Sequence, residues 1–320
     1  MSMPRSGRVA LAFLIFVHAT VLLASLLAPY PYDEQHRDFP FAPPTRIHWR
    51  DHRPSVYLSV LDLSSGTYRD DIRQPYHVQF LTGGRLFGVE RPAVIFLLGS
   101  DGFGRDVFSR LLYGAQVSLF TGLLAAILSI VVGLILGLTA GYFGGWLDQF
   151  LMRTGEMVMA LPWLYLLLAV RALLPLHVSP IQTFMLLIII IGGIGWVRPA
   201  RLIRAVVLSG KESDFVQAAR GFGASHSYVI RRHILPLTYT VVITQMTMLI
   251  PQYILAEVSL SFLGLGVGEP VPSWGNMLAE GMQYHAMVSH PWLLVPGLAT
   301  IPVLLGYLTL ADALLRRRNQ

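Results

Sequence analysis

The sequence contains no cysteine and few charged residues, and both shortages limit what the protein can be. None of the 320 residues is cysteine, so disulfides and thiolate metal sites are excluded, and cysteine usage says nothing about the redox compartment. Only 13% of the residues are charged, against about 25% in a typical soluble domain, whereas 54% are apolar. The composition therefore predicts a membrane protein.

Motifs for enzymatic and metal chemistry are also missing from the sequence. There is no GxxxxGK[ST] phosphate loop, no HExxH and no GxSxG, and no histidines pair at metal-ligand spacing. The segment "LSGKES" lacks the earlier glycine of a phosphate loop. We therefore expect no enzymatic activity, cofactor or metal in this chain. The net charge of +6 could indicate nucleic-acid binding, but the basic residues are distributed as those that set the orientation of membrane spans. No nucleic-acid binding is therefore expected.

Six segments are long and apolar enough to cross the hydrocarbon layer of about 30 Å as helices. They are residues 9–28, 117–140, 157–174, 181–203, 237–263 and 292–315. The first follows two arginines, as a signal peptide would, but its apolar run of about 20 residues is longer than a signal core. We expect an all-α polytopic membrane protein with six transmembrane helices.

Basic residues set the expected orientation of these spans. Arg5 and Arg8 precede the first span, and three arginines follow the last, so both termini are expected in the cytoplasm. Residues 198–233 carry seven basic residues against two acidic ones and fall on the same side. The opposite loop, after the fifth span, contains Glu269 and Glu280 and no basic residue.

A long polar segment separates the first two spans. Residues 30–92 carry eight arginines and eight acidic residues, and their alternating runs "SVYLSVLDL" and "HVQFL" predict strands of a small sheet. We expect an extracytoplasmic insert over 30–96, between a tail and first span in 1–29 and a five-span core in 97–320. A solvated linker is the alternative.

The residues after the insert, "LLGSDGFGRDVFSRLLYGAQVSL", predict a turn and then a helix. Asp101 can hydrogen-bond the backbone of the glycine-containing turn that follows it. Apolar residues at helical spacing then alternate with polar ones: Val107, Phe108, Leu111 and Leu112 with Arg105, Asp106, Ser109 and Arg110. This pattern predicts an amphipathic helix at the membrane surface that leads into the second span.

The spans hold a row of glycines and an acidic residue. Gly133, Gly137 and Gly141 allow close helix approach, either within this chain or at a subunit interface. Glu257 lies late in the fifth span, where an ionisable group usually faces protein or a water-filled cavity. An exposed position near the outer interface is the alternative.

Between the fourth and fifth spans lies the polar stretch "SDFVQAARGFGASHSYVIRRHILP". The preceding "SGKE" at 209–212 has the form of a capping box and predicts a helix start there. An apolar stripe follows at i, i+3, i+4 and i+7: Phe215, Ala218, Ala219 and Phe222. Gly223 can end the helix, Ser225 can cap a second short helix, and Pro236 can open the next span. A helix–turn–helix should project into the cytoplasm, with its stripe seated in a partner's groove or under this chain's own spans.

This stretch resembles the EAA loop of ABC-importer permeases, whose pattern is E-A-A-x3-G-x9-I-x-L-P. Five residues fall on the pattern, namely Ala218, Ala219, Gly223, Leu235 and Pro236, while Gln217 replaces the glutamate and His233 the isoleucine. The segments "LGSDGFGRDVFSRLLYGAQVSL", "AGYFGGWLDQFLMR", "ALPWL" and "EVSLSFLGLGVGEPVPSWGNML" are similar to the C-type permease of the dipeptide/oligopeptide/nickel importer family. Together they extend from residue 97 to the C-terminus.

The resemblance implies a permease subunit of an ATP-driven importer in the plasma (cell inner) membrane, for peptides or alternatively for nickel or another small solute. It implies four kinds of partner: a second permease, two cytoplasmic ATPase subunits that carry ATP and Mg, an extracytoplasmic substrate-binding protein and the lipid membrane.

The resemblance also implies roles for particular residues. Those expected to engage the ATPase, within a coupling loop over 205–236, are Asp214, Phe215, Gln217, Ala218, Ala219, Arg220, Gly223, Leu235 and Pro236. Glu257 and Ser261 are candidates for the translocation path or a subunit interface. A stand-alone secondary transporter and a membrane scaffold are the rivals. The scarcity of mid-span charges disfavours the first, and the projecting loop disfavours the second.

Overall fold

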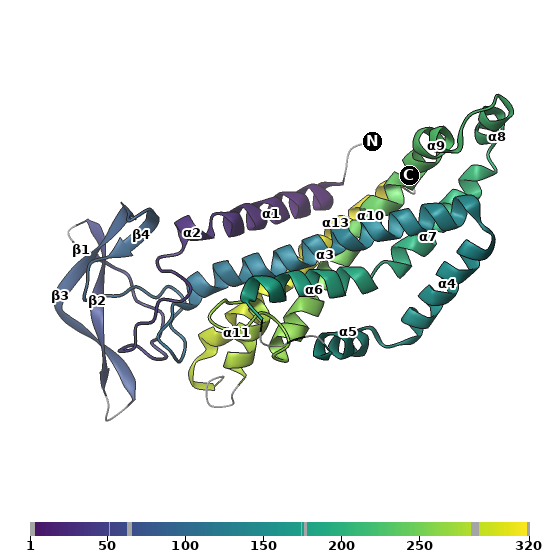
Figure 1. The fold of residues 1–320 in the computed structure, drawn as a ribbon. Helices are drawn as coiled ribbons and strands as arrows, with labels where there is room; N and C mark the ends of the chain where they lie inside the picture. The colour runs from purple at the N-terminus through teal and green to yellow at the C-terminus, as the bar shows by residue number, and fades with distance from the viewer. Residues whose placement is uncertain are drawn as a thin grey trace. The chain divides into compact units, whose positions relative to one another are not determined.

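The protein is described here from a computed structural model that covers residues 4–50, 52–62, 66–173, 175, 178–282 and 288–318. Helices make up most of it, and a small sheet lies between the first two long helices of the chain (Figure 1). The helical elements are α1 (Arg5–Leu22), α2 (Ala24–Leu27), α3 (Val107–Phe143), α4 (Gly145–Ala160), α5 (Trp163–Ala172), α6 (Pro180–Ile194), α7 (Val197–Lys211), α8 (Asp214–Gly221), α9 (His226–Val229), the π-turn η1 (Ile230–Ile234), α10 (Leu235–Phe262), α11 (Trp274–Gly281), the 3-10 turn η2 (Pro291–Leu294) and α13 (Val295–Arg318).

Among the described residues, four helices are long and apolar enough to cross a membrane alone. They are α1, α3, the continuous helix 226–262 and the helix 291–316. Two bent pairs, α4 with α5 at 93° and α6 with α7 at 41°, are long enough only together. If each pair is one span, the six expected spans are all present. The expected end of the third span, residue 174, lies outside the described residues.

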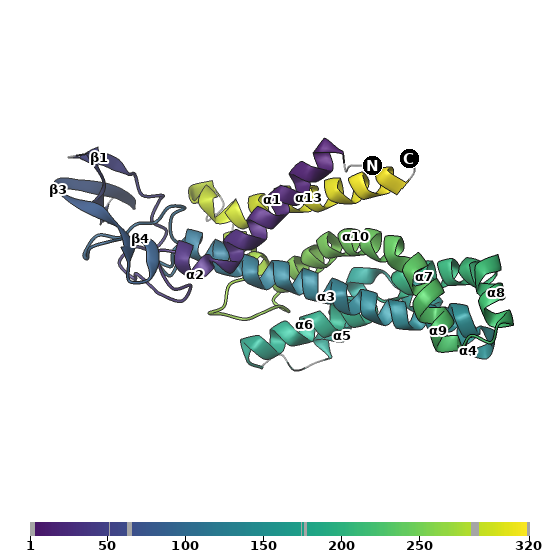
Figure 2. The same ribbon diagram turned by 90° about the horizontal axis from the view of Figure 1, so that it is seen from above.

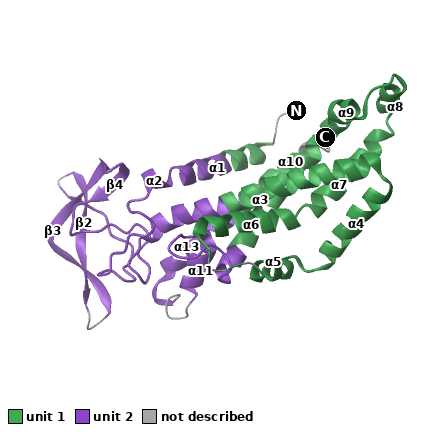
Figure 3. Cartoon of the chain, in the orientation of Figure 1, with its two compact units in different colours: residues 1–12, 120–257, 304–320 green, residues 13–119, 258–303 purple. Residues whose placement is uncertain are grey.

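The chain divides into two compact units (Figure 3). The first unit contains residues 1–12, 120–257 and 304–320, and the second contains residues 13–119 and 258–303. In the first unit, α8 and α9 lie next to each other at one end in both ribbon views (Figures 1 and 2).

In the first unit, α3 packs against α7 through its row of glycines. A β-carbon on Gly137 would lie 2.6 Å from the carbonyl oxygen of Ala200, and one on Gly141 would lie 2.8 Å from Cβ of Val207. Gly133 meets α7 in the same way. Of the two roles expected for this row, packing within the chain is therefore the one observed.

This contact makes Gly137 sensitive to substitution. We expect Gly137→Ala to lower the stability of the purified protein by about 1–3 kcal/mol, because the new methyl group overpacks a helix contact against backbone. Gly193→Ala, on α6, is the matched control, since nothing lies within 4 Å of the added carbon. Thermal unfolding of both variants is the measurement, and equal midpoints would contradict the packing argument.

In the second unit, the insert forms an antiparallel sheet in the order β1-β2-β3-β4. The strands are β1 (His48–Arg50), β2 (Arg53–Asp62), β3 (Thr67–Thr82) and β4 (Arg85–Val89). Val56 lies opposite Tyr76, and Val78 lies opposite Val89, on the face that packs against buried Ile95. The expected sheet is confirmed and the linker alternative is wrong. The extracytoplasmic location of the sheet stays a prediction.

The segment before α3 was predicted only in part. Asp101 does organise the turn, because its Oδ1 accepts hydrogen bonds from the amides of Phe103 and Arg105, both at 2.9 Å. The predicted helix does lead into the second span, since α3 is one helix from Val107 to Phe143, but its polar face is not exposed. The polar residues expected on its outer face are all buried: Arg105, Asp106, Ser109 and Arg110. The two arginines meet Glu269 and Glu280 from the far end of the chain, whereas the amide and hydroxyl of Ser109 donate to Asp106 beside it.

An ion network joins this turn and the start of α3 to α11 and the loop before it. Arg105 Nε lies 2.6 Å from Oδ2 of Asp101, and its Nη2 lies 2.9 Å from Oε1 of Glu280. Its Nη1 contacts Glu269. Arg110 Nη2 lies 3.0 Å from Oε1 of Glu269 and 3.4 Å from Oε1 of Glu280. Both guanidinium groups are buried, so the network holds α11 in place.

The two glutamates of this network titrate differently. Burial, together with the hydrogen bond to Glu269, raises the pKa of Glu280 to about 7. Burial alone would raise the pKa of Glu269, but the hydrogen bond from Glu280 and the charges of Arg110 and Arg105 lower it below its ordinary value. The pair therefore shares one proton near neutral pH.

The shared proton predicts a pH-dependent stability. A carboxyl group with a raised pKa contributes stability that is complete below its ordinary pKa of 4.5 and is lost as the pH rises through about 7. We expect the unfolding temperature of the wild type to fall between about pH 5 and pH 7, and Glu280→Gln to reduce that fall, because glutamine keeps a hydrogen-bonding group and cannot ionise.

Thermal unfolding of both proteins across this pH range is the measurement. Burial also raises the pKa of Asp106 to about 7, so part of the fall is expected to persist in Glu280→Gln. Identical pH profiles for the two proteins would contradict the assignment of the proton to Glu280.

Candidate coupling site

The helix that carries the apolar stripe begins later than the sequence indicates. The expected capping box is wrong, because Ser209 lies within α7 and Glu212 follows its last residue. Helix α8 begins at Asp214, and the hydroxyl of Ser213 donates to the carbonyl oxygen of Gly210 at 2.6 Å. Helix α7 continues through the capping-box sequence because its buried residues extend as far as Gly210. Tertiary packing thus overrides the local cap signal.

Helix α8 is anchored to the first unit by one buried side chain, Val216. It belongs to an apolar cluster that draws residues from α3, α7, α9 and η1: Tyr142, Ile203, Val207, Val229 and Ile234. Both helices of the hairpin are therefore attached to the long helices that lead to and from it. A force on the hairpin would be transmitted to α3, α7 and α10.

The predicted stripe faces outward instead of packing under the spans. Phe222 is 93% exposed, Phe215 is 49% exposed, and Ala218 is also exposed. Ala219 is half-buried, and Gln217 is exposed. A short helix with two exposed phenylalanines and a small residue between them is a surface that another protein can cover.

The turn between the two hairpin helices has the predicted chemistry. Gly223 has φ +83°, a left-handed conformation that favours glycine. The amide of Ala224 donates to the carbonyl oxygen of Ala219 at 3.0 Å, which closes the end of α8. The hydroxyl of Ser225 accepts from the amide of Tyr228 at 3.3 Å and so caps α9. The predicted roles of Gly223 and Ser225 are confirmed.

Tyr142, at the end of α3, is a functional candidate that sequence reasoning missed. Its hydroxyl lies 2.9 Å from Nδ1 of His226 in α9, and the guanidinium of Arg220 in α8 lies 5.0 Å from the centre of its ring. One side chain thus contacts both hairpin helices. The only signal in the sequence is an aromatic residue at the end of a span, which does not identify its partners.

Pro236 does not open the fifth span as expected. It is the second residue of α10, which continues without interruption from α9 and η1. Proline has no amide hydrogen and its ring crowds the carbonyl four residues earlier, so a normal helical turn cannot form there. The backbone instead widens into a π-turn, in which the amide of Leu235 donates to the carbonyl oxygen of Ile230. The second hairpin helix, α9, and the span are therefore one continuous helix.

The two candidates for the translocation path are buried within α10. Glu257 has no exposed surface, and Ser261 is 2% exposed. A β-carbon on Gly275 would lie 2.6 Å from Cβ of Ser261, so α11 covers that serine. Their roles in a path or an interface stay predictions.

Comparison with known proteins identifies the family. The family described as "Binding-protein-dependent transport system inner membrane component" matches residues 130–320. The chain belongs to this family. It is therefore a multi-pass inner membrane permease of an ABC importer, and the system in which it works also contains an ATPase and a binding protein. Catalysis of ATP hydrolysis is not the task of this component.

Several characterised permeases are similar to this one. The dipeptide transport system permease protein DppC of Bacillus subtilis (strain 168) is 37% identical over 191 residues, which are 60% of this chain and 58% of the relative. The oligopeptide transport system permease protein OppC of Escherichia coli (strain K12) is 36% identical over 91% of this chain and 78% of the relative. The glutathione transport system permease protein GsiD of Shigella flexneri serotype 5b (strain 8401) is 40% identical over 70% of this chain and 71% of the relative.

Proposed function

We propose that this permease imports peptides, together with a second permease, two cytoplasmic ATPase subunits and an extracytoplasmic substrate-binding protein. The names of three similar permeases support the substrate class, because they concern dipeptides, oligopeptides and glutathione. All three substrates are short peptides with ionised termini. We further propose that both termini of the chain lie in the cytoplasm, because the basic residues concentrate at the two tails and around the hairpin.

In the proposed mechanism, the α8–α9 hairpin seats in a cleft of one ATPase. ATP binding closes the ATPase pair, the seated hairpin moves, and the long helices attached to it switch between outward and inward openings. The observation that supports this mechanism is that α8 has two different faces. Val216 is buried in the permease on one face, while Phe215 and Phe222 are exposed on the other. The helix is thus fixed to one body and available to another. ATP can bias the spans only if this contact persists in both states.

Purification and uptake test the proposal together. The permease is expected to copurify with an ATPase encoded beside it, and the reconstituted complex to take up short peptides in an ATP-dependent manner when the neighbouring binding protein is added. A complex without an ATPase would overturn the coupling mechanism. Uptake of nickel or another solute in place of peptides would overturn the substrate class alone.

A further inference from the structure

Helix α4 is attached to the first unit along one face only. Gly155 faces α7, where a β-carbon would lie 2.7 Å from Cγ1 of Val197. One turn from the start of α4, both oxygens of Asp148 bind the guanidinium of Arg204 in α7, with Nη2 and Oδ2 2.5 Å apart. These contacts fix which side of α4 faces the rest of the unit.

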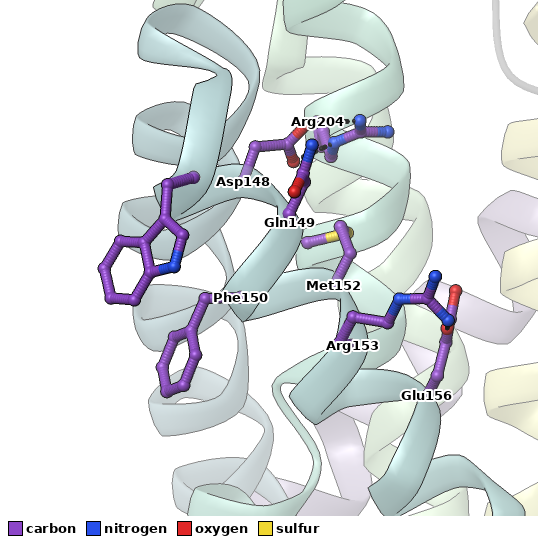
Figure 4. A pocket seen from close by; sticks show the side chains of 8 residues that line it. Asp148, Gln149, Phe150, Met152, Arg153, Glu156 and Arg204 are labelled. Carbon is purple, nitrogen blue, oxygen red and sulfur yellow. Dashed lines mark hydrogen bonds and ion pairs between the residues drawn. The ribbon is translucent and has the colours of Figure 1, made fainter.

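The remaining surface of α4 has an apolar flank and a polar flank. Leu147 and Met157 are exposed on the apolar flank, at 39% and 70%. Gln149 is exposed on the polar flank, and the side chains of Arg153 and Glu156 there are 79% and 52% exposed. Figure 4 shows Arg153 and Glu156 pointing to one side of the helix and Phe150 to another.

Lipid cannot cover the polar flank. Helix α4 and α5 form a candidate span only together, and the chain turns by 93° between them, at Leu161 and Pro162. Both residues of this break are exposed. Irregular backbone and charged side chains at membrane depth occur where they are buried in protein or line a water-filled cavity. An exposed break beside an exposed charged flank is therefore covered by another subunit or open to water, and the discontinuous helices of other transporters favour water.

We propose that the polar flank of α4 lines the aqueous path of the permease, and that Arg153 and Glu156 bind the terminal carboxylate and the terminal ammonium of a peptide in transit. The flank borders a cleft of about 660 Å³, whose wall also includes Arg204 of α7 and the aromatic side chains of Trp146 and Phe150 (Figure 4). This volume lies in the range of small-molecule sites, roughly 300–1,000 Å³.

The charges of this cleft fit a zwitterion. Arg153 Nη1 lies 3.8 Å from Oε2 of Glu156, and both side chains are exposed, so their pairing is weak and open to exchange. A peptide carboxylate can replace Glu156 on the planar guanidinium, and the peptide ammonium can then bind the released carboxylate. Arg204 is held by Asp148 and remains part of the wall. This ligand assignment rests on the proposed function, whereas the position of the path does not.

The chain has no cysteine, so single cysteines can map the water-facing side of α4. In the assembled transporter in membrane vesicles, we expect Gln149→Cys and Glu156→Cys to react with a charged methanethiosulfonate at least about tenfold faster than Leu147→Cys and Met157→Cys, which lie outside the cleft, because only a hydrated thiol ionises readily. Equal rates on the two flanks, or faster reaction on the apolar flank, would contradict the proposal that the polar flank of α4 lines the aqueous path.

Uptake of modified peptides tests the ligand. With one binding protein throughout, we expect Arg153→Gln to slow uptake of a peptide with a free carboxylate roughly tenfold or more, while uptake of its carboxamide changes little. Arg153→Lys should keep most of the selectivity, and Glu156→Gln should give the mirror result with an N-acetylated peptide. Equal losses for free and blocked peptides, or no loss for either, would overturn the assignment. If the wild-type complex takes up no peptide, the proposed function is wrong and the assignment of the ligand is wrong with it. The cysteine labelling pattern still tests whether α4 lines the aqueous path.

Discussion

Replacing Ala218 by aspartate is expected to reduce uptake by the assembled transporter to background, while the variant still inserts into the membrane. Ala218 is exposed and lies on the outward face of α8 between Phe215 and Phe222, so the fold of the permease does not depend on it. In the proposed complex this face is covered by the ATPase, and an aspartate there would bury a charge without a partner. Such a loss of docking removes the drive from ATP without changing the path.

Gln217→Glu is the matched control for the Ala218→Asp prediction. It adds the same charge one residue away, at an exposed position where the EAA pattern itself has glutamate, and it should leave uptake near the wild-type rate. The measurements are membrane level, copurified ATPase and ATP-dependent uptake for each variant. Wild-type uptake by Ala218→Asp, or equal losses in both variants, would show that the ATPase does not dock on this face.

Features that depend on a few neighbouring residues could be predicted from the sequence. Gly223 and Ser225 act on the backbone within three residues of themselves, and the structure gives each its predicted role. The six apolar segments are likewise local, since a span must be about 20 residues long whatever surrounds it. The stripe of α8 also follows from its spacing, which left open whether a partner or this chain's own spans would cover it. What spacing could not show is which side chain anchors the helix, and Val216 was overlooked.

Features that depend on residues far apart in the chain could not be predicted. Arg105 meets Glu280, 175 residues later, so the sequence around it indicates a polar helix face when the residue is in fact buried. Ser209 begins a good capping box, yet α7 continues past it because its buried face does. The break at Pro162 has a local cause, but its 93° angle depends on the packing of two helices.

Arg105→Ala is expected to destabilise the second unit by about 3–5 kcal/mol, the cost of removing one partner from a buried ion network. The guanidinium of Arg105 forms ion pairs with Asp101, Glu269 and Glu280, and the Arg105 side chain is only 4% exposed. Its removal leaves Arg110 alone to balance three carboxyl groups. Helix α11 should then loosen first, because Glu280 is its link to the network.

Arg69→Ala is the matched control, because Arg69 forms a surface pair with Asp62 at 3.3 Å with its side chain 75% exposed, and its loss should cost roughly 0–1 kcal/mol. Thermal unfolding and hydrogen exchange of residues 274–281 are the measurements for both. At pH 8, where Glu280 is ionised, Arg105→Gln combined with Glu280→Gln should recover part of the loss, since one positive and one negative charge leave the network together. If the two alanine variants unfold at the same temperature, the buried network does not hold α11. If the double variant is no more stable than Arg105→Gln, Glu280 is not the partner that carries the effect.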